Sequence, residues 1–295
     1  MSEQQKDFIF DGNKALFREE HDTEKAGILG QFLNLSEDMT AEDFLEEVLD
    51  GTEPFAATQI IGGETALLIQ RNVSESPNCL DCVLKIEGEN WSFEDALLRL
   101  EGLPGKIKVE SVCSWPNRFE GEIVGALGDR EFSFYVPFLQ FFEDEVKLGK
   151  EVPFEFAGLL NKVQKVQPKE FHISTGPLFE MARTQFLKDN PEKSASDFPY
   201  VVVRTNGMKI LNPTRYCSWH MFQGPVMECS ELLIHGHPFY RLKIQITDGD
   251  EDLDLFAYAS HKECGDYIPQ VGDDICGELW LIGYKEIPDY LRLKP

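Results

Sequence analysis

The chain has 295 residues, of which 42% are hydrophobic and 12% aromatic, so it can bury one or more cores and is not a disordered chain. Its 28 Lys and Arg side chains are outnumbered by 52 Asp and Glu side chains, which gives a formal net charge of −24. A field of that sign repels phosphate backbones, and no apolar run reaches the roughly 18 residues of a membrane span. We therefore expect neither direct nucleic-acid binding nor membrane insertion.

The N-terminal residues, MSEQQKDFIFDGNK, have neither the basic start nor the apolar centre of a signal peptide. The chain carries seven cysteines, an odd number spread over its length, which is typical of free thiols rather than of a disulfide framework. Both features predict a cytoplasmic protein.

Residues 1–104 are predicted to form an acidic α+β domain. A helix is expected over residues 40–50, where Thr40 occupies a capping position and Asp43 follows three residues later. The segment 92–101 has similar start and stop signals, so a second helix is expected there.

Strands are expected between these two helices. The segment 56–73 is rich in β-formers and is interrupted by Gly62-Gly63, which predicts a hairpin. The segment 79–88 predicts a third strand.

The helix expected over residues 40–50 offers the densest acidic surface of the chain. Residues 1–110 hold 24 acidic and 9 basic side chains, a net charge of −15. The apolar residues of this helix fall on one face, which leaves its carboxylates on the outer face. A merely solvated face is one interpretation; the other is a docking face for a basic partner, formed by Glu42, Asp43, Glu46, Glu47 and Asp50.

From residue 105 the pattern becomes β-rich. Short segments rich in β-branched and aromatic residues alternate with Gly or charged turns. Residues 105–170 are predicted to form a first β-barrel-like module, and residues 211–295 a second. Residues 171–210 are predicted to connect them through a helix that begins near Pro177 and a hairpin turned at Asn206-Gly207.

Two phrases recur in this β-rich part. Cys-Ser-Trp, followed by Phe, Gly and a β-branched residue, occurs at 113–115 and again at 217–219. An aliphatic residue, a Gly and two charged residues precede a strand at Leu148 and again at Val271. The order of strands resembles, in outline, a Greek-key barrel of the OB type. We therefore expect an α+β, β-rich fold with two OB-like modules made by internal duplication, in which the two tryptophans occupy equivalent buried positions.

Several Cys and His residues are candidate metal ligands by residue type. The C-x-x-C spacing near residue 80 could serve a zinc knuckle, but it lies within a strand pattern, without a second pair nearby. We therefore expect no metal site and no cofactor. The weaker alternatives are Cys79, Cys82, His235, His237, His261 and Cys264.

The sequence contains no P-loop, G-x-S-x-G or H-E-x-x-H string. The expected function is therefore non-catalytic: an acidic module of the inhibitor, immunity or adaptor type that binds a basic protein and could present carboxylates where phosphates would lie. The alternative is a metal-dependent enzyme with an unrecognised site in the C-terminal module, near His220, His235, His237 and His261.

Overall fold

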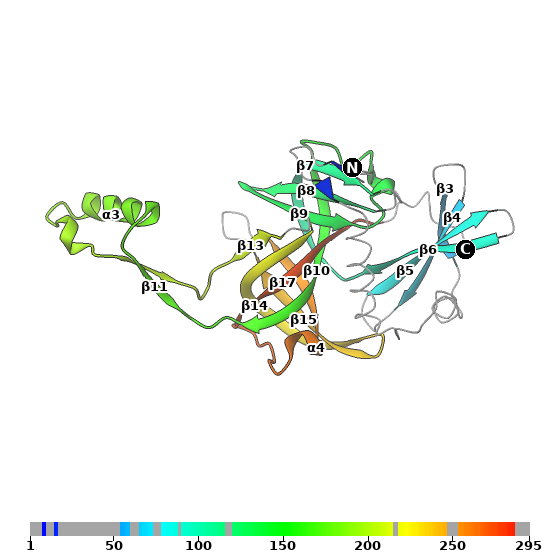
Figure 1. Cartoon of the computed structure of the whole chain (residues 1–295). Helices are drawn as coiled ribbons and strands as arrows, with labels where there is room; N and C mark the ends of the chain where they lie inside the picture. The colour runs from blue at the N-terminus through cyan, green and yellow to red at the C-terminus, as the bar shows by residue number, and fades with distance from the viewer. Residues whose placement is uncertain are drawn as a thin grey trace, which may run out of the picture.

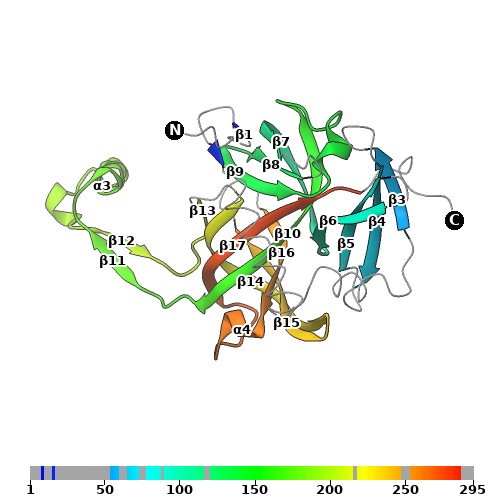
Figure 2. The same cartoon turned by 45° about the vertical axis from the view of Figure 1, so that its right-hand side comes forward.

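The structure is a computed structural model, and it is mostly β-sheet with few helices, as the sequence predicted (Figures 1 and 2). It describes residues 8–9, 15–16, 54–59, 65–72, 78–87, 90–115, 120–214, 218–246 and 253–286. Within these ranges, no helix is long and apolar enough to cross a membrane.

The described strands are β1 (Phe8–Ile9), β2 (Ala15–Leu16), β3 (Pro54–Gln59), β4 (Thr65–Asn72), β5 (Cys79–Glu87), β6 (Asn90–Arg99), β7 (Leu103–Ser114), β8 (Gly121–Leu127), β9 (Arg130–Val136), β10 (Glu151–Lys165), β11 (Glu170–Ile173), β12 (Val201–Arg204), β13 (Ile210–Pro213), β14 (Trp219–Ile234), β15 (His237–Gln245), β16 (Asp254–Ser260) and β17 (Asp274–Tyr284). The described helical segments are η1 (Leu139–Phe142), α3 (Pro177–Asp189), η2 (Ala195–Asp197) and α4 (His261–Cys264).

Strands β3 to β6 form an antiparallel sheet in chain order. The predicted hairpin is confirmed as β3 and β4, and the predicted third strand as β5. The helix predicted over 92–101 is wrong, because most of that segment lies in β6 and pairs with β5. Leu98 and Leu100 are buried and Arg99 between them is half-buried, which is the two-residue period of a strand. Pairing with a neighbouring strand has outweighed the local helix signals.

A nine-stranded sheet contains the remaining long strands, in the order β13-β14-β15-β16-β10-β17-β9-β8-β7. Additional pairings of β14 with β17 and of β10 with β7 close two rings of five strands. Ring one contains β7, β8, β9, β17 and β10; ring two contains β14, β15, β16, β10 and β17. The two long strands β10 and β17 belong to both rings and pair antiparallel with each other. Residues 105–170 and 211–295 therefore each give a strand to the ring of the other.

A short parallel pair completes each ring. Tyr135 of β9 lies opposite Ile282 of β17, and Tyr258 of β16 lies opposite Leu159 of β10. In ring one, η1 connects β9 to β10, and in ring two α4 connects β16 to β17. The two rings thus share the same sequence of connections.

The predicted equivalence of Trp115 and Trp219 is wrong. Trp115 follows the end of β7 and is buried, whereas Trp219 opens β14 and is half-buried. Strands β7 and β14 are the first strands of their rings in chain order. Trp115 follows the last residue of β7, whereas Trp219 is the first residue of β14, so the two side chains do not occupy equivalent positions. A three-residue string recurs too easily to fix a strand register.

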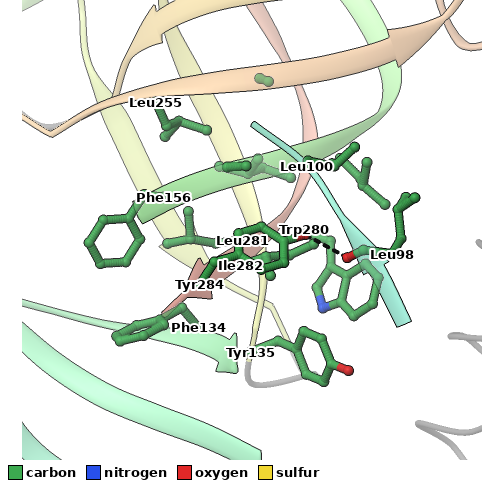
Figure 3. Close-up of a cluster of buried hydrophobic side chains, with 14 of the residues drawn as sticks. Leu98, Leu100, Phe134, Tyr135, Phe156, Leu255, Trp280, Leu281, Ile282 and Tyr284 are labelled. Carbon is green, nitrogen blue, oxygen red and sulfur yellow. Dashed lines mark hydrogen bonds between the residues drawn. The ribbon is translucent and has the colours of Figure 1, made fainter. Parts of the chain in front are cut away.

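Aromatic and aliphatic side chains fill the region where β17 passes between β9 and β10 (Figure 3). The rings of Phe134 and Phe156 meet edge to face, with centroids 5.1 Å apart. Tyr284 donates a hydrogen bond of 2.8 Å to the carbonyl of Leu98, which ties the four-stranded sheet to β17. Burial of these side chains supplies the main driving force for the contact between the two sheets.

Residues 169–205 form an arm that projects from the nine-stranded sheet (Figures 1 and 2). Its strands β11 and β12 pair antiparallel, and α3 lies at its far end. The predicted helix is confirmed, and it begins at Pro177 as expected. The predicted hairpin at Asn206-Gly207 is wrong, because β12 pairs back with β11 and β13 pairs with β14.

Candidate functional site

Part of the acidic surface can be placed. The side chains expected to bind a partner lie outside the described residues, so their role stays a prediction: Glu42, Asp43, Glu46, Glu47 and Asp50. Within the described part, the consecutive carboxylates Glu143, Asp144 and Glu145 are exposed on the turn between η1 and β10. Asp144 lies 3.4 Å from exposed Lys147, a surface pair of little energetic weight.

Cys79 and Cys82 are both buried on β5. Residues three apart on a strand point to opposite faces, so the two sulfur atoms do not converge on one metal ion. Burial raises the pKa of Cys79 to about 12, and the nearby carboxylate of Asp81 adds to this effect. A protonated thiol is a poor ligand and a poor nucleophile, so this pair has the properties of core residues.

His235 and His237 flank Gly236 in the tight turn between β14 and β15. His235 and Gly236 both have left-handed backbones, with φ of 48° and 78°. His261 begins α4, and its ring stacks on Tyr240 with centroids 4.2 Å apart. Each of these histidines is therefore part of a turn, a strand or a stacking contact.

Cys264 is buried at the end of α4, and burial raises the pKa of its thiol to about 12. Across the part of the chain that the structure describes, no three or more His, Cys, Asp or Glu side chains gather as a metal ion would require. The candidate ligands are thus not brought together as a site.

A buried polar cluster, here the interior cluster, lies where β8, β9, β14 and β17 meet. All of its members are less than 5% exposed. It consists of Glu120, Glu122, Ser133, Tyr135, Ser218, His220 and Trp280.

Ser218 is the central contact of the interior cluster. Its backbone N–H and its hydroxyl both donate to Oε1 of Glu122, at 3.1 and 2.6 Å. Its Oγ also accepts a 3.0 Å hydrogen bond from Nε1 of Trp280. Hydrogen bonds of this kind compensate a buried carboxyl oxygen for the water that it has lost.

Two further contacts join the strands of the cluster. The hydroxyl of Tyr135 donates to Oε1 of Glu120. Nε2 of His220 lies 2.7 Å from the backbone oxygen of Ser133, and since a carbonyl oxygen can only accept, this nitrogen carries a proton. The contact links β14 of ring two to β9 of ring one.

A contact that matches the one between Glu122 and Ser218 lies between β15 and the segment before β7. Arg241 of β15 forms an ion pair and a hydrogen bond with Glu101, which precedes β7. Tyr258 donates a 3.0 Å hydrogen bond to the carbonyl of Glu101. In each place, the second strand of one ring contacts a residue just before the first strand of the other ring. Glu122 of β8 contacts Ser218, which precedes β14, and Arg241 of β15 contacts Glu101, which precedes β7.

These contacts are suited to holding the two rings together. Glu122 and Ser218 are fully enclosed, so they cannot meet a macromolecular partner in the folded chain. Sequence reasoning missed the cluster because its partners lie far apart; Glu122 and Ser218 are 96 positions apart. The one local signal was the Glu-Gly-Glu string at 120–122, which places two carboxylates at the start of an otherwise apolar strand.

Comparison with protein-family models, with curated proteins and with solved structures finds no match to this chain.

Proposed function

We propose that the chain is a non-catalytic, acidic protein-binding module of the inhibitor, immunity or adaptor type, and that its partner is a basic protein. The observation that carries this proposal is the formal net charge of −24, of which −15 falls in residues 1–110. A surface of that charge speeds encounter with a basic partner and disfavours acidic ones. The contact face is assigned to the helix expected over residues 40–50.

The proposed mode of binding is mimicry of a nucleic acid, in which carboxylates stand where phosphates would lie. The described part of the chain carries further exposed carboxylates, those of Glu143, Asp144 and Glu145. The enclosed carboxylates of the interior cluster do not contribute to it. Partners that normally bind phosphate backbones with Lys and Arg are therefore the class favoured.

Affinity capture tests the proposal. The full chain is immobilised as bait, and a chain carrying Glu42→Lys, Glu46→Lys and Glu47→Lys serves as the matched control. We expect basic proteins to be retained at low salt by the unmodified bait, to elute as salt rises, and to be much reduced on the reversed bait. Retention of the same proteins on both baits would show that this helix is only solvated surface.

Competition with duplex DNA separates mimicry from other modes. A captured partner whose nucleic-acid surface is occupied by this chain should be released by added DNA. If salt releases the partner but DNA does not, the proposal of an acidic protein-binding module stands and the proposal of nucleic-acid mimicry is contradicted.

We also propose that each ring is an OB-like Greek-key barrel and that the two rings arose by internal duplication. This proposal is supported by the segments 132–160 and 255–283. Each residue of the first segment has the same place in ring one as the residue 123 positions later has in ring two, with no insertion or deletion between them. Tyr135 corresponds to Tyr258, and each lies at the parallel pair of its ring.

Two local irregularities support the same correspondence. The N–H of Gly149 bonds to the carbonyl of Val109 at 2.7 Å, and that of Gly272 to the carbonyl of Val226 at 2.8 Å. Both glycines have positive φ, 75° and 88°. The strand register also shifts directly after each of the two valines, in the pairing of β7 with β8 and of β14 with β15. Bulges and turns at matched positions are stronger support than short strings.

A reducing compartment, the cytoplasm, is the proposed location. Its support is the state of the thiols, because Cys79, Cys229, Cys264 and Cys276 are free thiols.

A further inference from the structure

The arm, residues 169–205, has a small aromatic cluster of its own. Phe179 and Phe186 of α3 pack against Phe198, with ring centroids 5.9 and 4.9 Å apart. Figures 1 and 2 both show α3 away from the sheets. The arm is thus a folded projection that the rings do not cover.

The arm exposes apolar side chains that the described part of the chain does not bury. Of twelve exposed large hydrophobic residues among the described ones, five lie in these 37 residues. On α3, Leu178 and Met181 are three residues apart, hence on one side of the helix, and are 50% and 72% exposed. The other three are Phe171, Tyr200 and Val202.

The ribbon of the arm also has one apolar face. Phe171 lies opposite Val203, and Ile173 lies opposite Val201, so these four side chains project from the same side of the ribbon. Phe171 is 50% exposed and the other three are only half-buried. Apolar surface of this kind on a folded protein marks an interaction site.

The charge of the arm indicates its occupant. Residues 169–205 hold five basic and five acidic side chains, so the arm has no net charge while the rest of the chain carries the whole −24. A docking surface for a basic protein would be expected to share the acidic excess. A neutral, apolar surface can instead be self-complementary, as a two-fold symmetric contact requires. Because the arm projects, two acidic bodies need not approach each other when two arms meet.

We propose that two copies of the chain associate through their arms, with the apolar side chains of α3 and of the β11–β12 ribbon forming the contact. This inference goes beyond the proposed function and does not rest on it. Salt should strengthen the association, because screening reduces the repulsion between the two bodies while the neutral contact is unaffected.

Sedimentation velocity and light scattering of the purified full chain, with reductant present, test the proposal. We expect a mass of twice 33.7 kDa at about 100 μM, and a dimer dissociation constant several-fold smaller at about 500 mM than at about 50 mM NaCl. A single chain mass at both salt concentrations would overturn the proposal.

A pair of matched variants locates the contact. Leu178→Ser with Met181→Ser should raise the dissociation constant at least about tenfold, since two apolar side chains lose their burial. The control is Leu148→Ser with Ile268→Ser, which changes two residues outside the arm that are 58% and 62% exposed. This control should leave the dimer dissociation constant unchanged. Equal weakening in both variants, or a dimer unaffected by the arm variant, would contradict the assignment.

A second variant removes the arm. Lys169 and Thr205 are joined by two hydrogen bonds of 3.0 Å, so a short Gly-Ser turn can replace residues 170–204 between them. This chain should be a monomer under all conditions. If the chain without the arm does not fold, the variant with Leu178→Ser and Met181→Ser still tests the proposed contact, because it alters only exposed side chains.

Discussion

At the level of single residues, Ser218 connects two buried partners, because its hydroxyl donates to Oε1 of Glu122 and accepts from Nε1 of Trp280. Its partners Glu122 and Trp280 come from β8 and β17, on different sides of the arm in sequence. Removing the hydroxyl leaves both partners with one hydrogen bond fewer in a site that water does not reach.

Ser218→Ala should therefore lower the free energy of unfolding by about 2 kcal/mol, within the usual range for a buried group left unsatisfied. Urea unfolding followed by circular dichroism measures this change. The control is Ser196→Ala in the arm, whose side chain is exposed, and its effect should stay below about 0.5 kcal/mol. Equal unfolding midpoints for the two variants would contradict the role given to Ser218.

The buried thiols and phenols predict how stability changes with pH. Burial raises the pKa of Cys79 and of Cys264 from 9.0 to about 12, and it also raises the pKa values of Tyr258 and Tyr284. The unfolded chain loses these protons first, so their contribution is complete below pH 9 and is lost as the pH rises toward the folded values.

The free energy of unfolding from urea titrations should thus begin to fall near pH 9 and fall more steeply above about pH 10, where unfolded tyrosines ionise. Cys79→Ala with Cys264→Ala should make the decline between about pH 9 and 10 shallower. An unchanged slope in that variant would show that the two thiols are not responsible.

At the level of elements, the positions of the strands along the chain could be predicted better than the pairing between strands. Most β-strand segments from β3 to β17 follow from β-branched and aromatic runs between turns, and α3 follows from Pro177 and its apolar positions. The segment 92–101 was misjudged because β6 is fixed by pairing with β5, which local propensity does not report. The phrases at Leu148 and Val271 marked matched turns, since each contains a glycine that the backbone requires in a left-handed conformation.

The exchange of strands could not be predicted. Nothing in β10 or β17 indicates that each would pair with strands of both rings, because the partner strands lie far along the chain; Glu155 of β10, for example, pairs with Tyr284 of β17. For the same reason the contact of Glu122 with Ser218 and that of Arg241 with Glu101 appear only in the folded chain.

This exchange predicts that the two halves remain together after the arm is cut. Limited trypsin treatment should cleave at the exposed Lys188 or Lys193. The two fragments should separate under denaturing conditions and elute together under native conditions, since β10 and β17 bind each half to the other. Fragments that separate on a native column would contradict the shared-ring architecture.

In the whole molecule, the two proposed associations involve different surfaces. The proposed basic partner would meet the acidic part of the chain, and the proposed second copy would meet the neutral arm. Salt consequently acts in opposite directions on the two proposed associations, weakening the first and strengthening the second. The two can be measured independently on the same preparation.

The association rate with the captured basic partner, measured against salt concentration, tests the proposed function most directly. Between about 20 and 300 mM NaCl, the rate constant of the unmodified chain should fall at least about tenfold, because charge steering acts mainly on the on-rate. The chain with Glu42→Lys, Glu46→Lys and Glu47→Lys should associate more slowly at low salt and with a flatter salt dependence. Equal rate constants for the two chains at low salt would contradict the assignment of this acidic face.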